Sequence, residues 1–166
     1  MSTVETVRAV ASTVPDPELP PLTLADLGVL RDVSVEPDGG LIVTITPTYS
    51  GCPALEAMRA DLVSRLAGAG YPDVRVRVAL SPAWTTDWIT EDGRRKLADA
   101  GIAPPGRVGP RAAGPVPLVL EPPSRSVPCP QCGGRSVELS RFGSTPCKSL
   151  RRCTACDEPF EHVKEL

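Results

Sequence analysis

Two Cys-x-x-Cys pairs near the C-terminal end of the chain constrain its fold most. The pairs are Cys129 with Cys132 and Cys153 with Cys156, and 20 residues separate them. Each pair can turn two thiolates toward one point, and two such turns complete a tetrahedron of sulfur ligands around one ion. The pattern predicts a zinc ribbon, although iron or an iron–sulfur cluster would use the same four thiolates. A redox-active dithiol pair is the other interpretation of the motif.

The residues around these pairs predict the rest of the ribbon. Alternating segments favour three short strands, over Ser136–Arg141, Lys148–Arg152 and Glu158–Lys164. Such a module has little hydrophobic core, so a bound metal would supply most of its folding free energy. We expect Cys147, a further cysteine, to be a small buried residue, although it could replace a ligand or join a cluster. We expect His162, the single histidine, at the surface of the last strand.

Proline divides the chain into three zones. The chain has 166 residues and 20 prolines, and eight of these prolines fall within residues 103–128. A segment so rich in proline cannot supply the backbone donors of a sheet and tends toward an extended conformation. We therefore predict a first domain over residues 1–102, a proline-rich linker over 103–128 and a zinc-ribbon domain over 129–166.

The first zone predicts a small α+β domain with a mixed three-stranded sheet. Two alternating strands flank a Pro-Asp-Gly-Gly turn, which indicates a β-hairpin. A helix and another strand follow, which favours a parallel crossover. The expected elements are a helix over Val4–Ala11, strands over Val29–Glu36 and Leu41–Pro47, a helix with Leu55, Met58, Leu62 and Leu66 on one face, a strand over Val74–Leu80 and a helix over Thr90–Ala100.

A lone cysteine, Cys52, precedes the first long helix. We expect Ser50 or Cys52 to cap that helix, with Pro53 at its first position. The unpaired backbone N–H groups there stabilise an anion, so the pKa of the Cys52 thiol should be lowered. Such a thiolate can act as a nucleophile or as a ligand of a soft metal. The alternative is a buried residue without a chemical role.

The acidic loop Asp-Pro-Glu-Leu-Pro is a second candidate site. Its carboxylates, Asp16 and Glu18, are held on a stiff segment bounded by prolines. Such a loop suits metal binding or docking, and the alternative is an ordinary solvated loop.

Charge and hydropathy exclude several classes of protein. The net charge is −2 and the isoelectric point is about 5.5, so the chain as a whole lacks the basic character of a nucleic-acid binder. No apolar run approaches the roughly 20 residues that cross a bilayer, and the N-terminal segment is not typical of a secretion signal. We therefore expect a cytoplasmic protein without a membrane segment, whose cysteines are metal ligands or reactive thiols.

Several segments, taken in their order along the chain, carry a resemblance to known proteins. They are VPDPELPPLTLADLGVLRDV, TPTYSGCPA, SPAWTTDWIT, GRRKLADAGIAPP, CPQCG, FGSTPCKSL and RCTACDEPFEHVK. In this order they resemble the PaaD/PaaJ family, the accessory subunits of the bacterial phenylacetyl-CoA epoxidase complex. The N-terminal part also resembles the wider SufT-like family of iron–sulfur assembly factors.

The resemblance implies a SufT-like α+β domain followed by a zinc ribbon, and it assigns residues to two sites. Asp16, Glu18 and Cys52 match the acidic loop and lone cysteine of the assembly family, where they would hold a metal or cluster transiently. The residues that match the C-terminal metal site, for zinc or an iron–sulfur cluster, are Cys129, Cys132, Cys153 and Cys156.

The function that the resemblance implies is assistance rather than catalysis. The oxygenase of such a complex uses a di-iron centre held by helical carboxylates and histidines, whereas this chain has one histidine and predicts no long helix. We expect a non-catalytic maturation factor that delivers iron or an iron–sulfur cluster to the complex. Its expected partners are the oxygenase and reductase subunits or cluster-assembly proteins, and a homodimer is compatible with this hypothesis.

Two other functions are consistent with the same residues. The first is a zinc-ribbon module that binds nucleic acid through its locally basic stretch, although nearby acidic residues dilute that charge. The second is a thioesterase that attacks CoA esters with Cys52, although the single histidine lies in the other module and leaves no evident general base. The basic residues in question are Arg135, Arg141, Lys148, Arg151 and Arg152.

Overall fold

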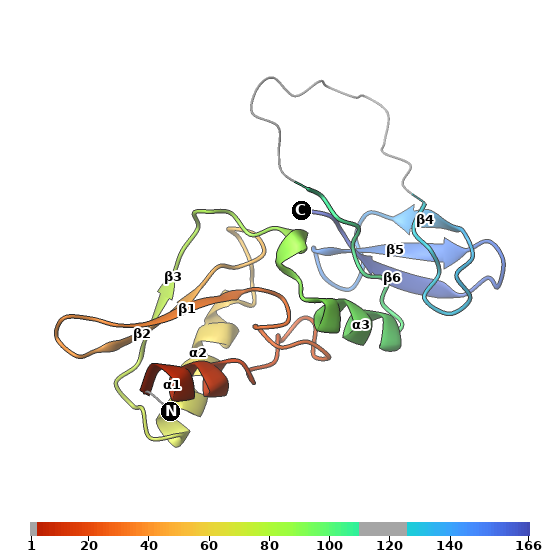
Figure 1. Cartoon of the computed structure of the whole chain (residues 1–166). Helices are drawn as coiled ribbons and strands as arrows, with labels where there is room; N and C mark the ends of the chain where they lie inside the picture. The colour runs from red at the N-terminus through yellow and green to blue at the C-terminus, as the bar shows by residue number, and fades with distance from the viewer. Residues whose placement is uncertain (1–2, 110–125) are drawn as a thin grey trace. The chain divides into compact units, whose positions relative to one another are not determined.

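The computed structural model describes residues 3–109 and 126–166, and the chain divides into two compact units (Figure 1). The first unit takes in the residues up to Lys96 together with Leu166, and the second takes in residues 97–165. Residues 110–125, most of the predicted linker, lie outside the described part. Two residues of the predicted linker that are described, Ala103 and Val127, are buried in the core of the second unit. The domain boundaries predicted from proline content stay a prediction.

A mixed three-stranded sheet forms the centre of the first unit, as predicted. Strands β1 (Leu30–Val35) and β2 (Leu41–Ile45) pair antiparallel across the Pro-Asp-Gly-Gly turn. Strand β3 (Arg75–Val78) pairs parallel with β2, so the strand order is β1-β2-β3. The predicted third strand extended to Leu80, but that side chain is 58% exposed and lies beyond the observed strand.

Two helices cover this sheet, because each has an apolar face with helical spacing. Helix α1 (Thr3–Ala11) packs against β1 and against helix α2 (Leu55–Gly68), which also contacts β3 (Figure 1). The face that α2 buries consists of Met58, Leu62 and Leu66. The α2 helix connects β2 to β3, which is the crossover that parallel pairing requires.

A loop held by Asp26 fixes the start of the last helix, α3 (Glu91–Asp99). The Asp26 carboxylate accepts hydrogen bonds from the Thr23 amide and hydroxyl and from Lys96 Nζ at 2.8–3.0 Å. Thr90 caps α3 as predicted, since its hydroxyl accepts from the Gly93 amide at 3.0 Å. A short 3₁₀ turn, η1 (Thr86–Trp88), precedes this cap.

The second unit contains an antiparallel sheet in the order β4-β5-β6, as predicted for a ribbon. The strands are β4 (Ser136–Ser140), β5 (Lys148–Cys153) and β6 (Pro159–Val163). The side chains buried together in its core are Ala103, Val127, Cys129, Cys153 and Phe160. This core is small for a module of its size, so other interactions must contribute to its stability.

The exposure predicted for His162 is wrong. The side chain is buried, with 4% of its surface exposed, and its Nδ1 lies 3.4 Å from the Ser149 hydroxyl. Ala103, the first residue of the predicted linker, forms a parallel bridge beside His162, because this end of the linker lies along β6. A single-sequence pattern cannot show which segment covers an edge strand.

Candidate metal centre

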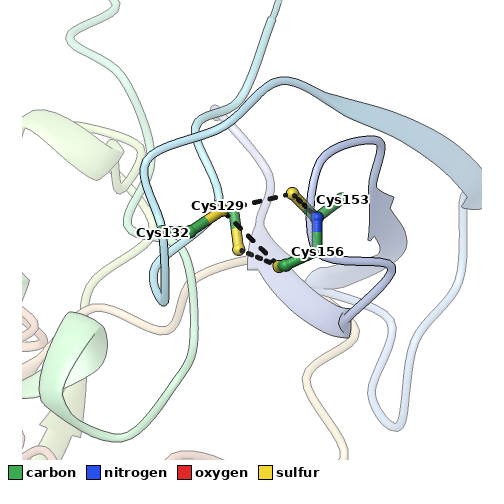
Figure 2. A group of neighbouring side chains, drawn as sticks. All are labelled: Cys129, Cys132, Cys153 and Cys156. Carbon is green, nitrogen blue, oxygen red and sulfur yellow. Dashed lines mark hydrogen bonds between the residues drawn. The ribbon is translucent and has the colours of Figure 1, made fainter.

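The four predicted ligands meet at one point in the ribbon (Figure 2). The sulfur atoms of the four cysteines all lie within 4.8 Å of one another. The Cys129–Cys156 sulfurs are 3.8 Å apart, and the Cys132 sulfur lies 3.5 Å from both Cys153 and Cys156. Two turns from distant parts of the chain therefore bring their thiols to a shared centre.

Glycines permit the first turn to approach this centre closely. Gly133 adopts a φ of +72°, a conformation that other residues rarely take, and its amide donates to the Cys129 carbonyl at 2.8 Å. A Cβ atom on Gly134 would lie 2.9 Å from the Ala155 side chain and 3.2 Å from the sulfurs of Cys132 and Cys153. The sequence Cys-Gly-Gly thus leaves room for the second turn.

This arrangement of sulfurs fits a tetrahedral metal ion. Zn–S bonds of about 2.3 Å place the sulfurs of a regular tetrahedron about 3.8 Å apart, close to the observed distances. Backbone amides also point at the sulfurs, as outer partners of metal thiolates do. The Ala155 and Cys156 amides donate to the Cys153 sulfur at 3.4 and 3.5 Å, and the Gly134 amide donates to the Cys132 sulfur at 3.4 Å. The residues present therefore suit a metal such as zinc.

The electrostatics of the four thiols favour a cation among them. The amides of Cys156 and Ala155 lower the pKa of Cys153 to about 6, so one thiolate forms readily. The Glu158 amide acts in the same direction on Cys156, but interactions with the thiols of Cys132 and Cys153 raise the pKa of Cys156 to about 12. Four thiolates at these distances repel one another. A divalent cation among them offsets this repulsion and allows all four to form together.

Cys52 lies outside this group, in the turn before α2. The prediction that Ser50 or Cys52 caps the helix is wrong, because α2 begins at Leu55 with Ala54 as its N-cap and no capping side chain. The Cys52 amide donates to the carbonyl of Tyr49, and the Cys52 carbonyl accepts from the Leu55 amide. These turn hydrogen bonds displace the helix start by two residues. The Cys52 side chain is buried, with 7% of its surface exposed.

Asp16 shapes the acidic loop. The side chain is buried, and its Oδ1 accepts hydrogen bonds of 2.8 Å from the amides of Glu18 and Leu19. This Asx-type turn has a sequence signal, an aspartate followed by proline, that predicts local capping as well as metal binding. Glu18 is half-buried on the same loop. Their predicted part in binding a metal or cluster remains a prediction.

Within residues 3–109 and 126–166, the four ribbon cysteines form the single group of three or more histidine, cysteine or acidic residues gathered closely enough for a metal ion. Cys52, Asp16 and Glu18 do not form such a group there. Cys147 is buried as expected, with its sulfur 3.2 Å from the Thr145 hydroxyl, and it is not a member of the four-cysteine group.

The contacts of Asp26 with Thr23 and Lys96 were not predicted from the sequence, although the Thr-x-x-Asp spacing signals reciprocal capping.

Among the described helices, none combines the length and the apolar character that a membrane span requires.

Comparisons with known proteins match both parts of the chain. The family of iron–sulfur cluster assembly proteins matches residues 4–80, and the family of PaaD zinc beta ribbon domains matches residues 113–164. A crystal structure of a domain of unknown function, DUF59, from Bacillus anthracis superimposes with a TM-score of 0.52 at 24% identity, covering 57% of this chain and 90% of that one. This structural likeness supports the fold alone.

Two curated relatives are similar in sequence. The chain is 31% identical over 98 residues to an Fe-S protein maturation auxiliary factor of Porphyromonas gingivalis, covering 58% of this chain and 92% of that protein. It is 42% identical over 162 residues to a putative 1,2-phenylacetyl-CoA epoxidase subunit of Escherichia coli, covering 97% of this chain and 92% of that protein. The chain therefore belongs to the PaaD family, in which an iron–sulfur cluster assembly domain precedes a zinc ribbon.

Proposed function

We propose that this chain is a cytoplasmic accessory protein of a phenylacetyl-CoA epoxidase complex, and that it helps to insert iron or an iron–sulfur cluster into one of the proteins of that complex. The observation that carries the proposal is the union, on one chain, of an assembly-family domain and a PaaD ribbon. Near full-length identity of 42% to the putative epoxidase subunit of Escherichia coli supports the choice of complex. The chain's role in this proposal is assembly rather than turnover.

The ribbon cysteines are the proposed ligands of a resident zinc ion. The spacing of their sulfurs and the amides that point at the Cys153 and Cys132 sulfurs support this assignment. A metal bound there supplies a cross-link between two turns that little other core holds together. The chain itself brings the four thiolates together, and Gly134 leaves the space beside the sulfurs that a larger side chain would fill.

Cys52 is the proposed transient ligand of the cargo, with Asp16 and Glu18 as its local support. A cargo that must leave is best held by few protein ligands, since four thiolates would retain it tightly. Asp16 contributes by fixing its loop through two amide hydrogen bonds, which presents Glu18 in a defined position. A thiol with 7% of its surface exposed is shielded from oxidation yet not fully sealed.

Iron loading of the client tests this function. Cys52→Ser and the matched control Cys147→Ser, which alters another buried lone thiol, are each co-expressed with the oxygenase and reductase subunits. The expected result is loss of iron from at least one client with Cys52→Ser and normal iron with Cys147→Ser. Equal iron and equal epoxidase activity with both variants would reject the role of Cys52.

A further inference from the structure

The outer strand of the ribbon carries an unusual group of exposed apolar side chains. Val137, Leu139 and Phe142 are 44%, 51% and 69% exposed. They account for half of the large apolar side chains exposed among the described residues, and they fall within six consecutive positions. Single exposed apolar residues need no explanation, but a contiguous group rimmed by polar residues is typical of an interaction site.

Strand β4 is an edge of its sheet, with β5 on one side and no further strand beside it among the described residues. Proteins usually protect such edges with charged residues or proline, because an open edge can pair with another extended chain. On β4, three consecutive positions are exposed, and the apolar Val137 and Leu139 flank the one charged residue among them, Glu138. The strand also has a bulge between Glu138 and Ser140, which leaves Leu139 without a direct partner in β5.

Basic side chains border this apolar group. Arg135, Arg141 and Lys164 line a cleft of about 960 Å³ together with Val137. Lys164 Nζ donates to the Arg141 carbonyl at 3.1 Å and lies 4.9 Å from the centre of the Phe142 ring, so Phe142 lies directly beside a basic side chain. We define the β4 surface as Arg135, Val137, Leu139, Arg141, Phe142 and Lys164.

The charge of the cleft is opposite to that of the whole chain. Its lining contains four basic residues, which are Arg135, Arg141, Arg151 and Lys164, and two acidic residues, which are Glu138 and Glu165. The excess of two positive charges contrasts with the net charge of −2 for the chain. Guanidinium groups bind carboxylates with two parallel hydrogen bonds, so the charge favours an acidic partner.

We propose that the β4 surface docks an extended acidic segment of a partner protein. The segment's apolar side chains lie against Val137, Leu139 and Phe142, and its carboxylates meet the basic rim, a mode that resembles strand addition to an open sheet edge. The inference deepens the proposed function, since an accessory protein must contact its client. The docking surface itself is argued from the structure, and only the identity of the partner rests on the proposed function.

Charge complementarity favours this occupant over two others. A second copy of the chain, docked through the same surface, would place its basic side chains against those of the first copy, and the like charges would repel. Residues 110–125 contain two arginines, one glutamate and five prolines, so they offer no acidic excess and few backbone donors.

Fluorescence anisotropy with labelled octapeptides tests the proposal on the full chain. The probes are an alternating Glu-Val peptide, a Lys-Val peptide that reverses the charge and a Glu-Ser peptide that removes the apolar groups. We expect the Glu-Val peptide to bind best and its affinity to fall with added salt. Equal binding of the Lys-Val or Glu-Ser peptide, or no binding of the Glu-Val peptide, would overturn the proposal.

Matched variants locate the peptide. The double substitution L139S with F142S should weaken Glu-Val binding about tenfold or more, as expected for loss of two central apolar contacts. The control pair V63S with L80S removes two exposed apolar side chains of the first unit, which are 42% and 58% exposed, and should leave the affinity unchanged. Equal effects of the two pairs would contradict docking on β4.

Charge substitutions provide an independent comparison. Arg141→Glu should weaken binding of the Glu-Val peptide and strengthen binding of the Lys-Val peptide. Arg59→Glu, on the exposed face of α2, should do neither. Tight, salt-sensitive binding of a DNA or RNA oligonucleotide that displaces the Glu-Val peptide would overturn the proposal in favour of a nucleic-acid surface.

Two other occupants of the β4 surface, a second copy of the chain and residues 110–125, would each give a different experimental result. A dimer in light scattering that F142S disperses would assign the β4 surface to a second copy. A tenfold gain in peptide affinity after replacement of residues 110–125 by glycine and serine would assign it to that segment. Either result overturns the proposal. Peptide docking that survives in Cys52→Ser, with unchanged client iron, would reject the proposed function while leaving the docking surface in place.

Discussion

Removal of metal from the four-cysteine group should unfold the ribbon and leave the first unit folded. Two of the five residues in the ribbon's core cluster, Cys129 and Cys153, are thiols of this group. Burial of a valine or phenylalanine contributes roughly 1.5–3 kcal/mol, so Val127 and Phe160 together supply about 3–6 kcal/mol. A structural zinc ion in a small module contributes about 10–16 kcal/mol at neutral pH. The metal is therefore the larger contribution, and its loss cannot be offset by these apolar contacts.

Hydrogen exchange with mass spectrometry measures this effect before and after anaerobic chelation under reducing conditions. Amides of β4, β5 and β6 should lose their protection, whereas amides of α2 should keep theirs and serve as the internal control. Cys153→Ser should reproduce the loss of protection without a chelator. Cys147→Ser, which changes a buried thiol outside the group, should not. Unchanged protection of β5 in metal-free, reduced protein would show that the ribbon folds without a metal, contrary to this prediction.

Other predictions concern the first unit. Asp26→Ala should lower the free energy of unfolding in urea by about 2–3 kcal/mol, because it removes several hydrogen bonds including that from Lys96. Asp32→Ala, which removes an exposed ion pair, should cost less than about 1 kcal/mol, and equal costs would contradict this ranking. Burial acts to raise the pKa of Asp26, but its hydrogen bonds hold that pKa below the ordinary value of 3.8. The stabilisation from the ionised Asp26 is fully present above pH 3.8 and is lost as pH falls through the lower pKa of the folded state. The loss of unfolding free energy caused by Asp26→Ala should therefore shrink below about pH 4. A loss that does not change with pH would contradict this prediction. Gly28→Ala should destabilise the first unit by about 2 kcal/mol or more, since Gly28 has a φ of +69° and a Cβ there would lie 2.7 Å from the Trp88 carbonyl oxygen; an unchanged urea midpoint would contradict this.

The regular elements were predictable because local signals determine them. The hairpin of β1 and β2 follows from alternation around a turn sequence, and the buried face of α2 follows from the spacing of Met58, Leu62 and Leu66. The four-cysteine group was equally predictable, since each Cys-x-x-Cys turn is a local structure. Pairing of the two turns required only that the strands between them form a sheet.

The features that sequence could not predict depend on contacts between distant residues. His162 is buried because the segment at Ala103 folds back beside β6, and no local pattern signals that contact. The start of α2 was misplaced because turn hydrogen bonds at Cys52 compete with helical ones. Asp16 was predicted to support metal binding from its place on a stiff acidic loop and from the family resemblance. The structure shows its carboxylate capping that loop, and its part in metal binding stays a prediction. The same residue type serves both purposes, and only geometry distinguishes them.

The most direct test of the account is a count of metals on anaerobically purified protein, before and after exposure to an iron–sulfur cluster donor. The wild-type chain should carry one zinc ion in the ribbon and acquire labile iron and sulfide with visible absorbance. Cys52→Ser should keep its zinc and acquire no cluster, whereas Cys147→Ser should behave as the wild type. Full cluster uptake by Cys52→Ser, or loss of its zinc, would contradict the division between a resident metal in the ribbon and a transient cargo at Cys52.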